Sequence, residues 1–193
     1  AMIYLEDVPL SESQTEIVLD HWLQLSQLHG AIESDIRAYQ SSADLRDARV
    51  MRHAVPAAMN ELGASFRNAG GRKVSTDWAV PYEKLGEALQ LSNEAIRKHH
   101  APAPITYGHA GNGHPHQNFI AENPDALQRI NAAVDETLHA VIDIGGTVSA
   151  EHGLGKLKRH WLSLQSTPRQ IDVMKALKHS LDPRGILAPG NIL

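Results

Sequence analysis

The sequence predicts an α+β protein organised as one unit. Short β-prone runs alternate with amphipathic helical segments, and capping residues, prolines and glycine pairs mark where these segments begin and end. The sequence has no internal repeat, low-complexity tract or linker that would divide it. With 193 residues it is long enough to bury a hydrophobic core.

The first segment combines a β-prone run with a helix. Residues 3–5 are the β-prone run. Ser13 and Glu16 then have the spacing of a capping box, and the apolar stripe that follows them ends at Gly30. A strand followed by a helix is therefore expected here.

The later elements carry similar local signals. Asn123 is a cap followed by proline at the first helical position, and the glycine pair 145–146 ends this helix. Thr167 opens another helix in the same way, and that helix ends at Asp182. The sequence also predicts helices over residues 42–62 and from Pro81, and a strand over residues 73–80.

Composition excludes several classes of protein. Hydrophobic residues make up 42% and charged residues 21%, which excludes disordered and fibrous chains. A formal charge of −4 leaves no broad basic face for nucleic acid or an anionic membrane. Because cysteine is absent, any metal must be bound by His, Asp or Glu. No uncharged stretch suits a membrane span and no signal peptide is visible, so a cytoplasmic protein is expected.

The chemistry is concentrated around Asn112-Gly113, which lies between two β-prone runs and predicts a tight hairpin. With these two residues as the loop, His109 would face His116. Directly opposed side chains have Cβ atoms about 5 Å apart, close enough for two imidazoles to share a metal ion. His114 is expected to be a turn residue rather than a ligand.

A second cluster completes the predicted site. A short run between glycines delivers Glu151 and His152 at its end. The carboxylate would complete a two-His-one-carboxylate set, which suits Zn²⁺, Mn²⁺ or Fe²⁺ and leaves His152 free as a base.

Two alternatives stay open at this level. Pro115 cannot donate to a strand ladder, so the turn could be a wider loop with the same outcome. His109 and His116 could also merely cap turns, with Glu151 paired to a nearby lysine or arginine.

Taken together, these residues resemble the carboxy-terminal, substrate-side domain of FAD-linked oxidases of the vanillyl-alcohol-oxidase type, similar to the D-lactate, glycolate and D-2-hydroxyglutarate dehydrogenases. The matching stretches follow in order and spacing over most of the chain. They are residues 51–56, 73–81, 108–116, 145–153 and 181–187.

The resemblance implies a ferredoxin-like cap of the α+β class, with an antiparallel sheet, helices on one face of it and a C-terminal helical tail. Residues 1–193 would form the C-terminal domain of such a protein, with a partial cap over about 2–150 and a helical return segment over about 151–193. The resemblance places FAD on a separate amino-terminal domain, which we expect this chain to lack. The chain is thus expected to be a fragment.

The resemblance also implies roles for individual residues. The implied residues are His109, His116 and Glu151 as ligands of a divalent metal, His152 as base, Arg52 and Lys73 as substrate-carboxylate partners, and Asn118 as a further polar contact. In this scheme the metal acidifies an α-hydroxyl, a histidine accepts its proton and a cation holds the carboxylate while hydride leaves Cα.

The sequence departs from the family pattern in two places. The family commonly has Asp at the position of Asn112 and Asn at the position of His114, which changes the polarity of the turn. The tail differs as well, with Ala-Pro-Gly-Asn at residues 188–191 where the family usually has Asn-Pro-Gly-Lys.

Three functional hypotheses follow. The first is the substrate- and metal-binding half of an FAD-dependent 2-hydroxyacid dehydrogenase, inactive alone. The second is a free-standing metalloprotein with flavin-independent chemistry, and the third is a non-catalytic interaction subunit. The expected partners are a small 2-hydroxyacid, an FAD-binding domain or subunit, and further copies of the chain, because a cap without its flavin domain exposes an apolar patch.

Overall fold

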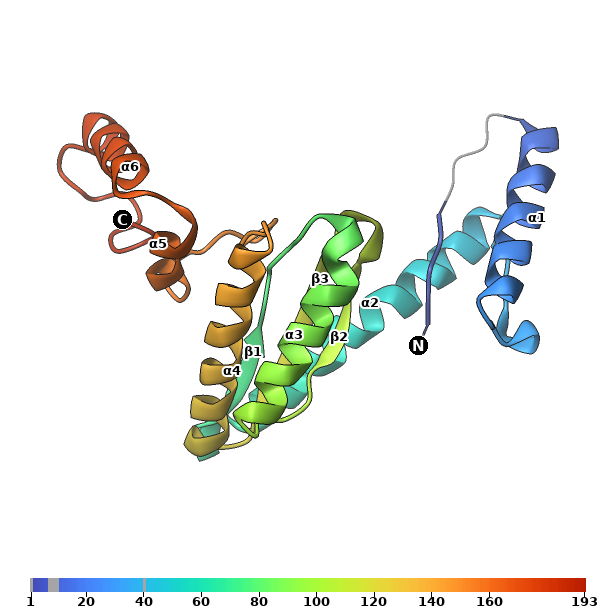
Figure 1. Cartoon of the computed structure of the whole chain (residues 1–193), viewed down its shortest axis with the longest axis horizontal. Helices are drawn as coiled ribbons and strands as arrows, with labels where there is room; N and C mark the ends of the chain where they lie inside the picture. Colours follow the sequence, from blue (N-terminus) through green and yellow to red (C-terminus); the bar gives the residue numbers. More distant parts are fainter. Residues whose placement is uncertain (1, 7–10, 40) are drawn as a thin grey trace. The chain divides into compact units, whose positions relative to one another are not determined.

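The computed structural model describes residues 2–6, 11–39 and 41–193 (Figure 1). The chain forms two compact units, Ala1–Val55 and Pro56–Leu193. Helix α2 (Ser42–Ser65) contributes its first part to one unit and its second part to the other.

The first unit contains α1 (Glu12–Leu28) and the beginning of α2. The cap of α1 is Ser11, whose side chain accepts a hydrogen bond from the backbone N–H of Gln14, so the predicted cap at Ser13 is wrong by two residues. The helix ends at Leu28, two residues before the predicted stop at Gly30, which has a φ of +76°. Residues 3–5 form no strand, because no described residue pairs with them in a ladder.

The second unit is built on a three-stranded sheet. Its strands β1 (Arg72–Ser75), β2 (Ile105–His109) and β3 (His114–Ala121) lie in the order β1-β3-β2, with both pairs antiparallel. Helices α3 (Leu85–Lys98) and α4 (Pro124–Asp143) lie side by side over the sheet (Figure 1). The α+β class and the antiparallel sheet are thus confirmed.

The order of elements follows a β-α-β-β-α-β pattern whose last strand is reduced to one bridge, between Ala79 and Thr147. The strand predicted over residues 73–80 is therefore shorter than expected. The N–H of Thr76 still donates to the carbonyl of Gln117 on β3, but the carbonyl of the next residue, Asp77, accepts a hydrogen bond from the N–H of Ala150 instead.

The alternation of side chains along β3 separates a core face from a functional face. Phe119 and Ala121 point into the core, where they meet α4 residues such as Ile130 and Leu138. Residues at even positions of β3 lie on the opposite face. On that side, α2 approaches β1 so closely that a Cβ at Gly63 would lie 2.6 Å from the Cβ of Lys73.

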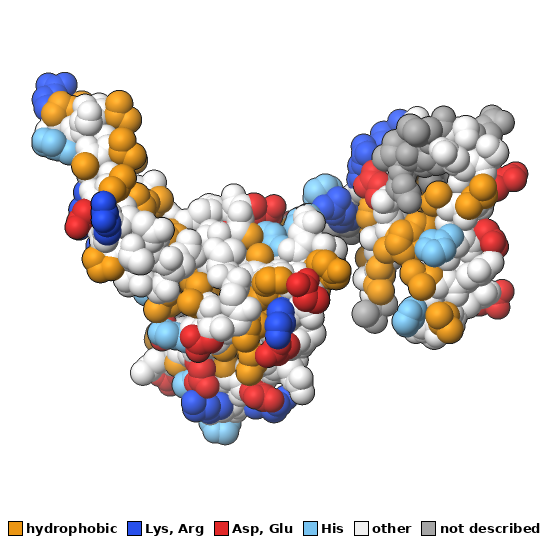
Figure 2. Space-filling view, turned by 45° about the horizontal axis from the view of Figure 1, so that its top comes forward, with side chains coloured by type: hydrophobic (Ala, Val, Ile, Leu, Met, Phe, Trp, Pro, Cys, Tyr) orange, Lys and Arg blue, Asp and Glu red, His pale blue; other side chains and the backbone are white. Residues whose placement is uncertain are grey.

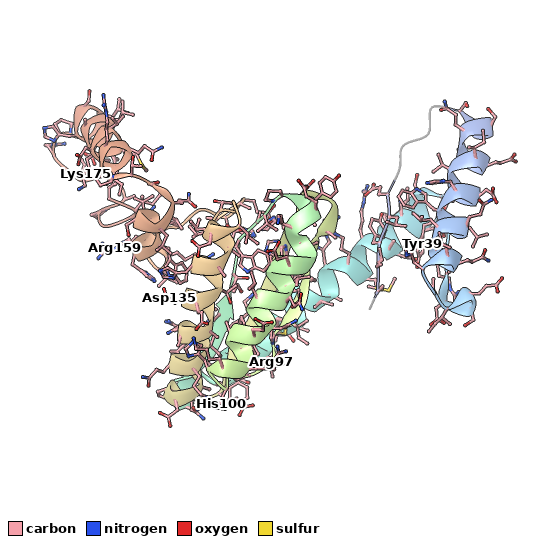
Figure 3. All side chains as sticks on the ribbon, in the orientation of Figure 1. Tyr39, Arg97, His100, Asp135, Arg159 and Lys175 are labelled. Atoms are coloured by element: carbon pink, nitrogen blue, oxygen red, sulfur yellow. The ribbon has the colours of Figure 1, made fainter. Side chains whose placement is uncertain are left out.

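The C-terminal segment contains α5 (Leu162–Gln165) and α6 (Pro168–Leu181). Thr167 and Gln170 form the capping box of α6, as the sequence predicted for its start. Trp161 donates a 3.1 Å hydrogen bond to Asp135 on α4, which is labelled in Figure 3.

The surface of the molecule is mixed. Figure 2 shows acidic and basic side chains interspersed over its central part and apolar side chains gathered along its C-terminal helical part. On α6, Val173, Leu177 and Leu181 are exposed at a spacing of four residues. Exposed apolar stripes of this kind mark interaction sites, but self-association of the chain stays a prediction. Among the described helices, none is both long and apolar enough to cross a membrane.

Candidate metal and substrate site

The hairpin between β2 and β3 carries three histidines. Residues Ala110–Asn112 form a 3₁₀ turn, and Gly113 follows in the left-handed conformation with a φ of +63°. The ladder pairs His109 with His114 and Tyr107 with His116. The predicted pairing of His109 with His116 is therefore wrong, because the loop has four residues instead of two.

The three histidines still share one face of the sheet. A register shift of one residue turns every side chain to the other face, whereas a shift of two restores the original face. The ring of His109 accordingly lies 5.7 Å from that of His114 and 5.7 Å from that of His116, measured between centroids. The predicted proximity of His109 and His116 is thus observed in a different register.

His114 is a buried strand residue and not a turn residue. Its Nε2 lies 3.1 Å from Oδ1 of Asp77, and the side chain of Asp77 is completely buried. The other carboxylate oxygen of Asp77 accepts hydrogen bonds from the hydroxyl of Ser149 at 2.6 Å and from the backbone N–H of His152 at 3.0 Å. Asp77 therefore joins the sheet to the segment that carries Glu151.

Glu151 is the point on which the site converges. Its Oε1 lies 3.2 Å from Nε2 of His116, 3.1 Å from Nε2 of His152 and 3.8 Å from Nε2 of His109. His116 is nearly buried, whereas the side chain of His152 is 63% exposed. The accessible imidazole of His152 thus lies beside potential ligands that are less exposed than it is.

Burial and hydrogen bonding set the charges at the site. Burial alone would raise the pKa of Asp77, but the bonds from Ser149 and the His152 amide, with the charge of Lys158, hold this pKa below its ordinary value. Burial and then the neighbouring ring of His114 lower the pKa of His116. At neutral pH the site therefore combines an ionised Asp77 with a neutral His116.

Two overlapping groups of side chains offer the donors of a divalent-metal site. One ligand atom from each of His109, His114, His116 and Glu151 lies within 4.8 Å of all the others. The second group contains Asp77, His116, Glu151 and His152 within the same limit. Imidazole nitrogens with a carboxylate oxygen suit Zn²⁺, Mn²⁺ and Fe²⁺, so the donor chemistry fits a divalent ion.

The predicted substrate residues lie in different surroundings. Lys73 on β1 donates a 2.5 Å hydrogen bond to Oδ1 of Asn60 on α2. Asn118 is buried and accepts a 2.7 Å bond from the hydroxyl of Ser75. Arg52 is an exposed residue of α2 within the first unit. The roles of these residues stay predictions.

Lys73 also borders a cavity of about 250 Å³ that carries positive charge. Its lining residues are Asn60, Gly63, Ala64, Arg67, Arg72 and Lys73. Burial lowers the pKa of Lys73. No described carboxylate forms an ion pair with the three cations of this cavity.

Sequence reasoning missed Asp77 and Lys158 and misjudged His114. A signal for His114 was available, because residues two apart on a strand share a face and His116 was already a candidate ligand. Asp77 had no comparable signal, since it lies within a run predicted as strand. Lys158 is half-buried near Asp77; burial lowers its pKa and the carboxylate partly opposes this.

The chain is similar, over part of its length, to several proteins that are named as oxidases or dehydrogenases. It is 35% identical over 118 residues to the glycolate oxidase subunit GlcD of Bacillus subtilis, which covers 60% of this chain and 25% of the relative. It is 32% identical over 126 residues to a probable mitochondrial D-lactate dehydrogenase of Danio rerio, covering 64% and 25%. It is 33% identical over 126 residues to the D-2-hydroxyglutarate dehydrogenase of Stutzerimonas stutzeri, covering 60% and 26%.

The chain matches only about a quarter of the length of these relatives. The family described as FAD linked oxidases, C-terminal domain, matches residues 12–192 and thus nearly the whole sequence. By this match the chain belongs to the family of FAD-linked oxidase C-terminal domains.

Proposed function

We propose that this chain is the substrate- and metal-binding half of an FAD-dependent 2-hydroxyacid dehydrogenase. The observation that carries the proposal is the convergence of His109, His116 and His152 on one oxygen of Glu151, at 3.8, 3.2 and 3.1 Å. Support also comes from the relatives, whose names all refer to enzymes of hydroxyacids.

His109, His116 and Glu151 would hold the divalent ion. When bound, such an ion acts as a Lewis acid that lowers the pKa of a coordinated hydroxyl group. Because burial keeps His116 neutral, its lone pair is available without a proton having to leave first.

His152 is the proposed base. Its side chain is the most exposed of the four histidines at the site, so a small substrate can reach it. Because Nε2 faces Glu151, Nδ1 is the nitrogen that accepts the hydroxyl proton. A flavin on an FAD-binding domain would supply the acceptor for the hydride from Cα, so that loss of this hydride and of the hydroxyl proton would convert the 2-hydroxyacid into a 2-oxoacid.

The substrate carboxylate needs a cation on the same face. Lys73 lies on that side of β1, since it is two positions from Ser75, which bonds Asn118. Its Nζ would exchange the amide oxygen of Asn60 for a carboxylate oxygen, a stronger, charge-assisted partner. Arg52 is a second candidate, on the family resemblance alone.

The proposal is tested by titrating the Mn²⁺-loaded chain with D-lactate in a calorimeter. Propionate, which lacks the α-hydroxyl, is the control ligand. D-Lactate should bind the loaded chain and should bind neither the metal-free chain nor a Glu151→Ala variant. Equal heats from D-lactate and propionate, or a chain that binds neither Mn²⁺ nor Zn²⁺, would contradict the proposal.

A further inference from the structure

Asp77 and His114 form a buried pair beside the proposed ligands. The side chains are 0% and 6% exposed, and Nε2 of His114 lies 3.1 Å from Oδ1 of Asp77. The ring of His114 also lies 4.4 Å from that of His116, centroid to centroid. A buried imidazole this close to two other histidines and a glutamate needs a chemical reason.

The hydrogen bonds of Asp77 define which nitrogen of His114 carries the proton. Oδ2 already accepts from Ser149 and from the His152 amide, so this group acts as an ionised acceptor. Facing such an acceptor, Nε2 of His114 is the donor. In the neutral form of the ring, Nδ1 is then the nitrogen whose lone pair is not engaged by Asp77.

We propose that His114 is a third imidazole ligand of the metal site, held by Asp77 in a carboxylate–histidine–metal arrangement. The site then comprises His109, His114, His116 and Glu151, the group whose donor atoms lie within 4.8 Å of one another. Carboxylates that accept from the outer nitrogen of a ligating histidine fix its tautomer and make it a better donor.

The alternative group, which uses Asp77 itself as a ligand, is less suitable. Both oxygens of Asp77 are occupied by donors, two on Oδ2 and one on Oδ1. Binding an ion there would break bonds that hold the Glu151 segment against the sheet. That group also takes His152, which the proposed reaction needs as a free base.

This inference rests on the proposed metal site and adds one ligand to it. Metal affinity is measured by calorimetry with Zn²⁺ and Mn²⁺ for the wild-type chain, His114→Asn and Asp77→Asn. His139→Asn on α4 is the matched control, because His139 is an exposed histidine outside both groups. Asp77→Asn should weaken binding by about 10–100-fold, the usual effect of losing an outer carboxylate, and His114→Asn by more.

A second measurement counts the imidazoles in the wild-type chain and needs no variant to fold. In the Co²⁺-substituted chain, each ligating histidine gives a paramagnetically shifted, exchangeable N–H proton signal in the NMR spectrum. Three such signals are expected. The signal of the His114 Nε2–H should exchange slowly with solvent, because this proton is buried against Asp77, and it is the signal that should disappear in His114→Asn.

The outcomes separate this inference from the proposed function. If wild type shows only two shifted signals, or if folded His114→Asn binds metal within about twofold of wild type, His114 is not a ligand. The site of His109, His116 and Glu151 would then still stand. If wild-type chain binds no divalent ion at all, both proposals fail.

Discussion

The rings of His114 and His116 lie edge to face with centroids 4.4 Å apart, on the same face of β3. Burial disfavours a charged imidazole at His116, and repulsion between two imidazolium ions at this distance disfavours it further. The pKa of His116 is lowered for these reasons. His116 therefore presents a neutral nitrogen, which is the form that binds metals.

Replacement of His116 or Glu151 by alanine should remove most of the divalent-metal binding, because each contributes an atom to both possible ligand groups. His152→Ala should change the affinity little, since His152 is proposed as base and not as ligand. Calorimetric titration with Zn²⁺ and Mn²⁺ measures all three, with His139→Ala as the control. A large loss in His152→Ala, in addition to the losses in His116→Ala and Glu151→Ala, would favour the group that contains Asp77.

Gly113→Ala should destabilise the protein by at least about 2 kcal/mol, through strain at positive φ and a steric clash. The new Cβ would lie 2.0 Å from the carbonyl oxygen of Val80. Gly111→Ala, in the same turn, is the matched control, because no atom lies within 4 Å of a Cβ there. Urea unfolding compares the two variants, and equal midpoints would show that the turn does not dock on Val80.

Gln117→Leu should cost about 2–4 kcal/mol, since each buried donor left without an acceptor costs about 1–3 kcal/mol. The Oε1 of Gln117 accepts hydrogen bonds from Nε1 of Trp78 at 3.3 Å and from the hydroxyl of Ser92 at 2.9 Å. The exposed Gln128 provides the control substitution Gln128→Leu. Thermal unfolding should separate these variants clearly, and a stable Gln117→Leu protein would mean that the network contributes nothing.

Acid should open the turn after α6. The pKa of Asp182 is lowered by its bonds from Lys178 and from the amides of Ile186 and Leu187, which outweigh burial. Its stabilisation is therefore complete above the unfolded pKa of about 3.9 and is lost as pH falls through the lower folded value.

Amide hydrogen exchange measured across this pH range tests the prediction. Protection at Ile186 and Leu187 should decrease in acid, and Asp182→Asn should show low protection at every pH. Protection that is independent of pH in the wild-type chain would mean that Asp182 does not hold the turn.

The sequence by itself determined the elements whose signals are local. Asn123 caps α4 and Thr167 opens α6 as predicted, because a cap bonds backbone groups within its own first turn. The sequence also placed His109 and His116 on a common face, since the alternation of side chains along strands is fixed by backbone geometry.

Only the tertiary structure decided the register and the full composition of the site. The carbonyl of Gly113 accepts a hydrogen bond from the N–H of Val80, so a distant segment fixes the four-residue loop and pairs His109 with His114. The Asp77–His114 contact joins residues 37 positions apart. Such contacts depend on how strands and loops pack in three dimensions, and no local pattern of residues encodes them.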